Sequence, residues 1–246
     1  MDPVLYSSMN GSQLDFNRQH IIGNNMANIN SPGFKADLFK AQSLFLTGSV
    51  TSGEARAVQQ QNDTDFSDGP IVNTGNNLDV AIQGSGWFAV QDSKGKEAYT
   101  RAGNFHINEN GMLVTATNLP VLGDGGPISI PPAQEINIGE DGTISIVPID
   151  GPPGLVATID RLRLVKLDKN NLIKDTNGLM KLQQGSPAPV ADATLTIVSG
   201  ALEGSNVNSV EQMVNMIASG QEFNSKMKIM GTAESNAQKL AQLLQL

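Results

Sequence analysis

The chain has 246 residues, of which 39% are hydrophobic, so it is long enough to bury one large core or two smaller ones. Its net charge of −8 lies in the middle, because residues 1–40 and 205–246 each carry three acids and three bases. An acidic middle disfavours nucleic-acid binding, and the absence of cysteine excludes disulfides, thiolate nucleophiles and cysteine-based zinc sites.

A helix is the first predicted element. Asp2 is expected as its N-cap and Pro3 as its first helical residue, where the missing N–H costs nothing. Ser31-Pro32-Gly33 is expected to end the helix, because proline cannot donate to it and pushes the preceding residue out of the α region. The apolar stripe of this helix is thin and contains Leu5, Met9, Phe16 and Met26.

Polar sequence with scattered glycine and aspartate follows at residues 39–70. It is compatible with an extended hairpin or with a flexible arm, and the sequence does not choose between them. From Leu78 onward the pattern changes to short apolar runs separated by turns, which predicts mainly antiparallel strands. Strands are expected at residues 78–82, 87–90, 112–114 and 195–198.

One hairpin can be predicted with its register. Ile136 and Ile138 are expected to face Ile146 and Ile144 across Asp141-Gly142. An Asp-Gly pair between two such runs favours a type I′ turn, in which both central residues have φ > 0.

A second long helix is predicted to begin near Asn206 or at Asn208, where Asn208 and Glu211 have the spacing of a capping box. Its stripe steps by three and four residues, a period of 3.5 that is typical of a left-handed supercoil. We favour packing against neighbouring chains over packing on its own domain, because the body need not cover a helix of this length. The stripe contains Met213, Met216, Gly220, Phe223, Met227, Met230, Glu234, Ala237, Ala241 and Leu244.

Residues able to carry chemistry are few. His20 and His106 are isolated, and each is expected to be structural or exposed. The segment Asp63–Asp68 suggests a calcium loop but places Asp68 where glycine is needed and Thr74 where a bidentate glutamate is needed. We therefore expect no catalytic residue, metal ligand or cofactor, and no enzyme activity.

We also expect neither a signal peptide nor a membrane span. Residues 1–8 have neither a basic start nor an apolar run, so we expect no cleavable signal peptide. No stretch approaches the roughly 20 apolar residues of a membrane span, so no membrane insertion is expected.

Four motifs, in order along nearly the whole chain, resemble those of the flagellar rod and hook family of axial proteins. The first contains Asn-Asn-Met-Ala-Asn and Gly-Phe-Lys, and the last contains Gly-Ser-Asn-Val. The motifs are Asn24 to Lys35, Leu78 to Phe88, Tyr99 to Phe105 and Gly200 to Val207. Within the family, the resemblance is greatest to the proximal-rod type.

The resemblance implies an α+β fold with a mainly antiparallel β body on a helical stalk formed by the N- and C-terminal helices. It implies an N-terminal helix (1–35), an extended arm (36–77), a β-rich outer domain (78–200) and a C-terminal helix (201–246). It also implies a structural subunit of the proximal rod that transmits torque across the periplasm.

The implied partners are other proximal and distal rod subunits and, during secretion, the flagellar type III export apparatus. The chain is expected to be a monomer before assembly. Assembly contacts are expected at Leu5, Met9, Phe16, Asn24, Asn25, Met26, Asn28, Asn30, Gly33, Phe34, Asn206, Met213, Met216, Ile217, Gly220, Phe223, Met227, Met230 and Leu244.

Two alternatives remain open from the sequence. One is a distal rod or hook-type axial protein, which differs in place rather than in kind. The other belongs to a different class: a glycan-binding or hydrolytic β domain, built around Trp87 and Asp63–Asp68, with helical oligomerisation ends.

Overall fold

The computed structural model describes residues 3–45, 55–149, 152 and 155–243. The chain forms two compact units. Unit 1 comprises residues 1–29, 36–65 and 207–246, and unit 2 comprises residues 30–35 and 66–206. The family resemblance implied domain boundaries at residues 35, 77 and 200. The two units divide the chain elsewhere, because the short segments 30–35, 66–77 and 201–206 pack with the strands of unit 2.

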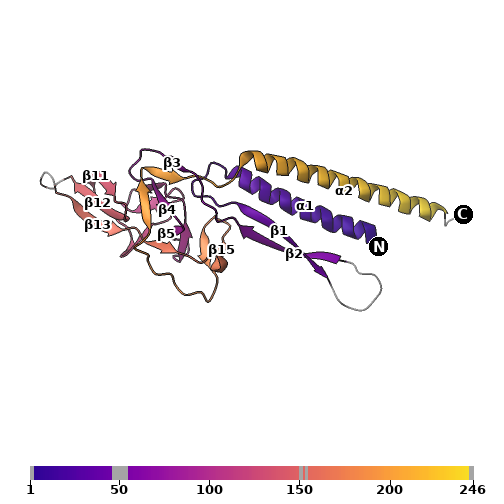
Figure 1. Ribbon diagram of the computed structural model, residues 1–246, viewed down its shortest axis with the longest axis horizontal. Helices are drawn as coiled ribbons and strands as arrows, with labels where there is room; N and C mark the ends of the chain where they lie inside the picture. The colour runs from indigo at the N-terminus through magenta and orange to yellow at the C-terminus, as the bar shows by residue number, and fades with distance from the viewer. Residues whose placement is uncertain (1–2, 46–54, 150–151, 153–154, 244–246) are drawn as a thin grey trace. The chain divides into compact units, whose positions relative to one another are not determined.

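Unit 1 consists of two long helices and one hairpin. Helix α1 spans Pro3–Ala27 and α2 spans Ser209–Leu243, and the two lie side by side (Figure 1). Strands β1 (Asp37–Phe45) and β2 (Ala55–Thr64) pair in antiparallel fashion. Of the two alternatives for residues 39–70, the described part of this region is therefore a hairpin, while residues 46–54 lie outside the described residues.

The first helix ends three residues earlier than predicted. Its last residue is Ala27, so it stops before Ser31-Pro32-Gly33 is reached. The backbone N–H of Asn28 donates to the carbonyl oxygens of Asn24 and Asn25, and its side-chain Nδ2 donates to Asn24 O at 2.9 Å. Asn28 thus donates to carbonyl groups at the end of the helix, and the helix ends before the proline is reached. At the other end, Pro3 is the first helical residue, as predicted, whereas Asp2 lies outside the described residues.

Helix α2 begins at Ser209, with Asn208 as its N-cap. The side-chain Oδ1 of Asn208 accepts hydrogen bonds from the backbone N–H of Val210 at 3.0 Å and of Glu211 at 3.3 Å. Of the two predicted starts, the one at Asn208 is confirmed, because an asparagine oxygen can bind the N–H groups that the first helical turn leaves free.

Unit 2 is built from short strands, and every pairing between its described strands is antiparallel. Its largest sheet has the order β14-β5-β6-β16-β15, and β11, β12 and β13 form a second sheet (Figure 1). Two strands each form the sheets β17-β4, β18-β3, β7-β8 and β10-β9.

The strands of the largest sheet are β5 (Gly86–Gln91), β6 (Glu97–Thr100), β14 (Leu164–Lys166), β15 (Leu172–Lys174) and β16 (Met180–Leu182). Those of the second sheet are β11 (Ala133–Ile138), β12 (Thr143–Pro148) and β13 (Ala157–Arg161). The paired strands are β3 (Ile71–Asn73), β4 (Val80–Gln83), β7 (Phe105–Ile107), β8 (Leu113–Thr115), β9 (Leu122–Gly123), β10 (Gly126–Pro127), β17 (Thr196–Ser199) and β18 (Ala201–Glu203). Each predicted strand thus overlaps an observed one.

Strand β5 is buried on both faces. Because side chains alternate along a strand, Phe88 and Val90 enter the larger apolar core, while Trp87 and Ala89 enter a smaller one with Tyr99. The sheet therefore separates two cores within unit 2.

The hairpin register at Ile136 is confirmed, but the turn type is wrong. Ile136 pairs with Ile146 and Ile138 pairs with Ile144. In the loop only Gly142 has a positive φ, at 84°, and Asp141 does not. The Asp141 side chain instead accepts the backbone N–H of Thr143 at 3.0 Å, which stabilises a loop longer than two residues.

The fold is α+β, with one helix near each terminus and antiparallel strands between them. Within the described residues, neither helix combines the length and apolar character that crossing a membrane requires.

A buried ionic cluster and an exposed helix face as the candidate functional site

Four charged side chains from distant parts of the sequence meet in unit 2, and we call them the ionic cluster: Lys35, Asp68, Arg101 and Glu203. Lys35 Nζ lies 2.8 Å from Glu203 Oε1 and 3.5 Å from Asp68 Oδ1. Arg101 Nε lies 3.1 Å from Glu203 Oε2, and Arg101 Nη2 lies 2.6 Å from Asp68 Oδ1. The side chains of Lys35, Arg101 and Glu203 are at most 3% exposed, whereas that of Asp68 is 61% exposed.

The ionic cluster is balanced, with two cations and two carboxylates. Burying a charge is costly unless it is paired and hydrogen-bonded. Backbone groups add to the pairing: Lys35 Nζ donates to Ser67 O at 2.7 Å, and the N–H of Gly69 donates to Glu203 Oε1 at 3.0 Å. Arg101 Nη1 is buried without a hydrogen-bond partner. The guanidinium of Arg101 also lies 5.8 Å from the ring centre of Trp87, a distance suited to a cation–π contact.

Gly33 allows the backbone to approach the ionic cluster closely. Its N–H donates to Glu203 O at 2.7 Å, and its φ is +66°. A Cβ at this position would lie 2.3 Å from the carbonyl carbon of Arg101, which no side chain can tolerate. The Gly-Phe-Lys motif therefore combines a close backbone contact at Gly33 with a buried cation at Lys35.

The neighbouring residues are tied to the same place. Asn206 Nδ2 donates to Ser67 O at 3.2 Å, and the Asn206 N–H donates to Phe34 O at 3.3 Å. Lys174 Nζ lies 4.0 Å from the ring centre of Phe34 and donates to Lys35 O at 2.8 Å. The chain passes between unit 2 and unit 1 after Lys35, before Phe66 and after Asn206. The cluster and its neighbouring contacts therefore hold these three chain ends of unit 2 together.

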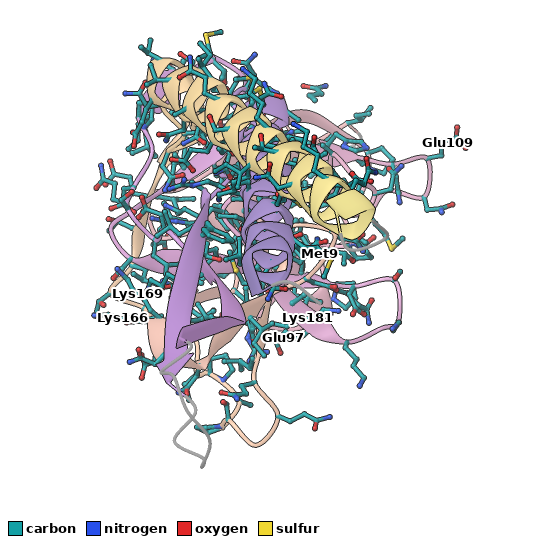
Figure 2. The ribbon with its side chains drawn as sticks, turned by 90° about the vertical axis from the view of Figure 1, so that its right-hand side faces the viewer. Met9, Glu97, Glu109, Lys166, Lys169 and Lys181 are labelled. Atoms are coloured by element: carbon teal, nitrogen blue, oxygen red, sulfur yellow. The ribbon has the colours of Figure 1, made fainter. Side chains whose placement is uncertain are left out.

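A second ionic group in unit 2 is centred on Lys181, which is labelled in Figure 2. Lys181 Nζ lies 2.9 Å from Asp92 Oδ2 and 2.7 Å from Asp175 Oδ2. The hydrogen bond from Lys181, with further ones from the backbone N–H groups of Lys96 and Lys94, lowers the pKa of Asp92 to about 2. Hydrogen bonds to Asp175 and Asp92 in turn raise the pKa of Lys181.

Helix α1 carries predicted assembly residues in both exposed and buried positions. Met9, which is labelled in Figure 2, is 56% exposed, and Phe16 is 48% exposed. Asn25 is buried: its Nδ2 donates to Asp37 O at 2.9 Å, and its Oδ1 accepts the Asp37 N–H at 2.8 Å. The Asn25 amide thus binds both the N–H and the C=O of Asp37, the first residue of β1, as the backbone of a neighbouring strand would.

The other predicted residues near α1 take several positions. Asn24 and Asn30 are exposed, and Met26, Asn28, Gly33 and Phe34 are half-buried. Leu5 belongs to α1 but lies outside the residues whose side chains the structure describes.

Helix α2 turns inward a set of residues that only partly matches the predicted stripe. Its less exposed positions are Gln212, Met216, Ser219, Gly220, Phe223, Lys226, Met230 and Ala233. The predicted stripe shares Met216, Gly220, Phe223 and Met230 with this row, but it placed Met213, Met227 and Glu234 where the structure turns Gln212, Lys226 and Ala233 inward. As a result Met213 is 55% and Met227 is 45% exposed.

Four residues on α2 form an apolar face at the surface, and we call it the outer face: Val210, Met213, Val214 and Ile217. They follow the i, i+3, i+4, i+7 spacing of one helix face. Each is between 55% and 68% exposed. Gly220 is half-buried, and Leu244 lies outside the described residues.

The structure does not favour a reactive pocket around Trp87 and Asp63–Asp68. Trp87 is 6% exposed within a core, next to Phe66. Asp63 is paired with Lys40, and Asp68 with Arg101. Carboxylates engaged in this way are poorly placed to act on a ligand, and no group of three metal-binding side chains occurs within the described residues.

The two histidines are also placed without partners for catalysis in the described part of the chain. His20 is exposed on α1 and meets the edge of the Phe16 ring. His106 is exposed on β7, with Nε2 3.3 Å from Asn118 Oδ1, beside a shallow hollow. Both are surface side chains, as expected.

The residues of the ionic cluster were not singled out from the sequence as site residues. Lys35, Arg101 and Glu203 each belong to one of the four family motifs, so the motifs themselves were the signal. What the sequence could not show is that three motifs converge at one buried point.

A long helix with an exposed apolar face is typical of a structural protein that assembles with other chains. Comparison with known proteins agrees. Three family models match: "Flagella basal body rod protein" at residues 5–35, "Flagellar hook protein FlgE/F/G D1 domain" at 81–146 and "Flagellar basal body rod FlgEFG protein C-terminal" at 198–243.

Whole-length relatives give the same answer. The flagellar basal-body rod protein FlgF of Salmonella typhimurium is 36% identical and that of Escherichia coli 37% identical, with 100% of both chains covered in each case. The flagellar basal-body rod protein FlgG of Bacillus subtilis is 33% identical over 97% of this chain and 98% of its own. The chain belongs to the flagellar basal-body rod protein family and is a structural subunit of the basal body.

Proposed function

We propose that this chain assembles into the proximal rod through its terminal helices, which form a stalk for the β body, and that it transmits torque across the periplasm. The outer face of α2 is the single observation that carries this proposal. Four large apolar side chains in one contiguous row are rarely left in water unless another surface covers them. Copies of this chain or related rod subunits are the partners that the family supplies.

The length of α2 supports the same reading. Helix α2 continues past the start of α1, so its last described turns have no α1 residues beside them (Figure 1). An isolated helical end is marginal in water and is stabilised by packing. Neighbouring subunits provide that packing in an assembled rod.

The ionic cluster supports the mechanical part of the proposal. Lys35 and Glu203 hold two chain ends of unit 2 together, at positions where force along the chain would be applied. Buried pairs are screened little by salt. Separating a buried pair leaves both charges without their partners, and removing just one partner of such a pair costs about 3–5 kcal/mol, so the pairs resist extension.

Further parts of the proposal follow from family membership. The chain acts without catalytic activity or a cofactor, leaves the cytoplasm through the flagellar export apparatus, and is a monomer before assembly. Unit 1, with both long helices, supplies the helical inner domain, and unit 2 supplies the outer β domain.

A paired substitution on the outer face tests the assembly role. Met213→Glu/Ile217→Glu places two carboxylates in the apolar row without touching the side facing α1. We expect a soluble chain that is missing from isolated basal bodies, and cells that do not swim. The matched control, Ala218→Glu/Ser225→Glu, adds the same charge at exposed positions flanking the row. The control should swim normally.

Normal incorporation of the Met213→Glu/Ile217→Glu chain would remove the outer face from the assembly surface. A deletion of residues 210–246 asks the broader question. If cells carrying this deletion build filaments and swim, assembly through α2 is wrong.

A further inference from the structure

We propose that Gly11, Asp15, Ser219 and Lys226 form a polar lock that sets the register in which α1 and α2 pair within one chain. The inference concerns unit 1 alone and goes beyond the proposed assembly role. It rests on buried polar contacts at the centre of an interface that is otherwise weakly specified.

The contacts converge on Asp15. Lys226 Nζ lies 2.7 Å from Asp15 Oδ2, and Ser219 Oγ donates to Asp15 O at 3.4 Å. Asp15 is 4% exposed and Ser219 is fully buried. Asp15 thus binds two positions of α2, seven residues apart, through its side chain and its carbonyl group.

Gly11 makes room for the cation. Lys226 Nζ donates to Gly11 O at 3.2 Å. A Cβ on Gly11 would lie 3.3 Å from Lys226 Cδ and Cε, closer than most side chains approach. The absence of a side chain at Gly11 therefore lets the lysine stem cross α1 and reach a main-chain oxygen.

The two helices run antiparallel, because Gly11 and Asp15 meet Lys226 while Arg18 meets Glu222. The Arg18–Glu222 pair is about half exposed, and such pairs contribute little to stability or specificity. Asp15 and Ser219 of the lock are buried, by contrast, and the side chain of Lys226 is 33% exposed.

The apolar residues of α2 do not by themselves fix the register of α2 against α1. The row of α2 that faces inward repeats every seven residues, with Met216, Phe223 and Met230 at equivalent places. Sliding α2 by one heptad, roughly 10 Å, would keep methionine and phenylalanine against α1. The same slide would leave the buried carboxylate of Asp15 without its cation, which is costly, whereas Lys226 is 33% exposed and would keep part of its hydration. A single polar position fixes register in coiled coils for this reason.

Chemical crosslinking tests the register directly, because the chain has no cysteine and an introduced pair is unambiguous. Arg18→Cys/Glu222→Cys reports the observed register. Arg18→Cys with Asn215→Cys, or with Ile229→Cys, reports a slide of one heptad in either direction. A bismaleimide shorter than the displacement of one heptad should link the first pair at least roughly tenfold faster than the other two.

The test variant is Asp15→Leu/Lys226→Leu in the full-length chain. We expect it to remain helical by circular dichroism while the slipped pairs crosslink at rates comparable to the native pair, because an apolar seam no longer distinguishes the registers. The matched control, Gln13→Leu/Lys228→Leu, adds the same two leucines at exposed positions and should keep the native crosslink alone.

Three outcomes would overturn the proposal. In the first, the leucine pair keeps the native crosslink alone. In the second, the control slips as much as the test variant does. In the third, the leucine pair loses its helical signal, because the polar contacts then supply stability rather than register.

Discussion

Lys35 and Glu203 are 168 residues apart in sequence, and their side chains meet at 2.8 Å with at most 3% of either exposed. Each belongs to a different family motif, and Arg101 from a third motif binds the other oxygen of the same carboxylate. The motifs by which the family is identified are therefore parts of one physical object, a buried ion cluster at the ends of unit 2.

Removing the charge of Glu203 should be strongly destabilising. In Glu203→Gln the side-chain shape is kept, but Lys35 and Arg101 lose their shared buried counter-charge. We expect the free energy of unfolding to fall by about 3–5 kcal/mol in chemical denaturation. Glu222→Gln, which removes a half-exposed partner of Arg18, should cost less than about 1 kcal/mol. Equal losses in the two variants would show that burial of the cluster has no energetic consequence.

Gly33→Ala should be more harmful than positive φ alone predicts. Gly33 and Gly75 both have positive φ, at 66° and 73°, but only Gly33 has backbone within reach of a Cβ, whereas around Gly75 there is open space. Gly75→Ala should cost about 1–2 kcal/mol, the usual penalty of the left-handed region. Gly33→Ala should exceed that, because the 2.3 Å approach to Arg101 forces the two segments apart. Thermal unfolding of both variants measures the difference, and similar melting temperatures would contradict the close approach.

Two glycines in α2 should be replaceable with a gain in stability. Gly220 and Gly231 are helical, and a Cβ on either meets nothing within 4 Å. Alanine at each position should stabilise the helix by up to about 1 kcal/mol, because glycine loses more backbone entropy. Circular dichroism during heating measures the gain. Gly11→Ala is the informative comparison, since crowding of Lys226 should offset the same propensity gain.

Acid should weaken unit 2 through Asp92. Its pKa is lowered to about 2 by the hydrogen bond from Lys181 and by backbone N–H groups, compared with about 3.9 in an unfolded chain. A carboxylate with a lowered folded pKa stabilises the fold fully above the unfolded value and loses that contribution as the pH falls toward 2.

The measurement for Asp92 is the difference in unfolding free energy between the parent chain and Asp92→Asn. This difference should be constant near neutral pH and should shrink between about pH 4 and pH 2. In a Lys181→Met background this difference should change less with pH, because the substitution removes the main cause of the lowered pKa of Asp92. A difference that stays constant down to pH 2 would rule out this role for Asp92.

Local features of the fold could be predicted because their causes lie within a few residues. Asn208 caps α2 through the two N–H groups that follow it. The facing of Ile136 and Ile146 follows from strand alternation on both sides of a turn. The errors were local too: Asn28 ended α1 before the proline, and Asp141 bonded to Thr143 in place of a type I′ turn.

The sequence by itself determined that a helix lies near each terminus, that the middle is rich in strands, how α2 is capped, and the family. Periodicity and motifs depend only on neighbouring residues. The tertiary structure alone decided that Lys35, Arg101 and Glu203 share one buried site, because contact across 168 residues depends on how the whole chain folds. It also decided which row of α2 turns inward. Hydrophobicity favoured Met213 and Met227 for the inward row. The structure instead turns Ser219 and Lys226 inward, because both contact α1 at Asp15.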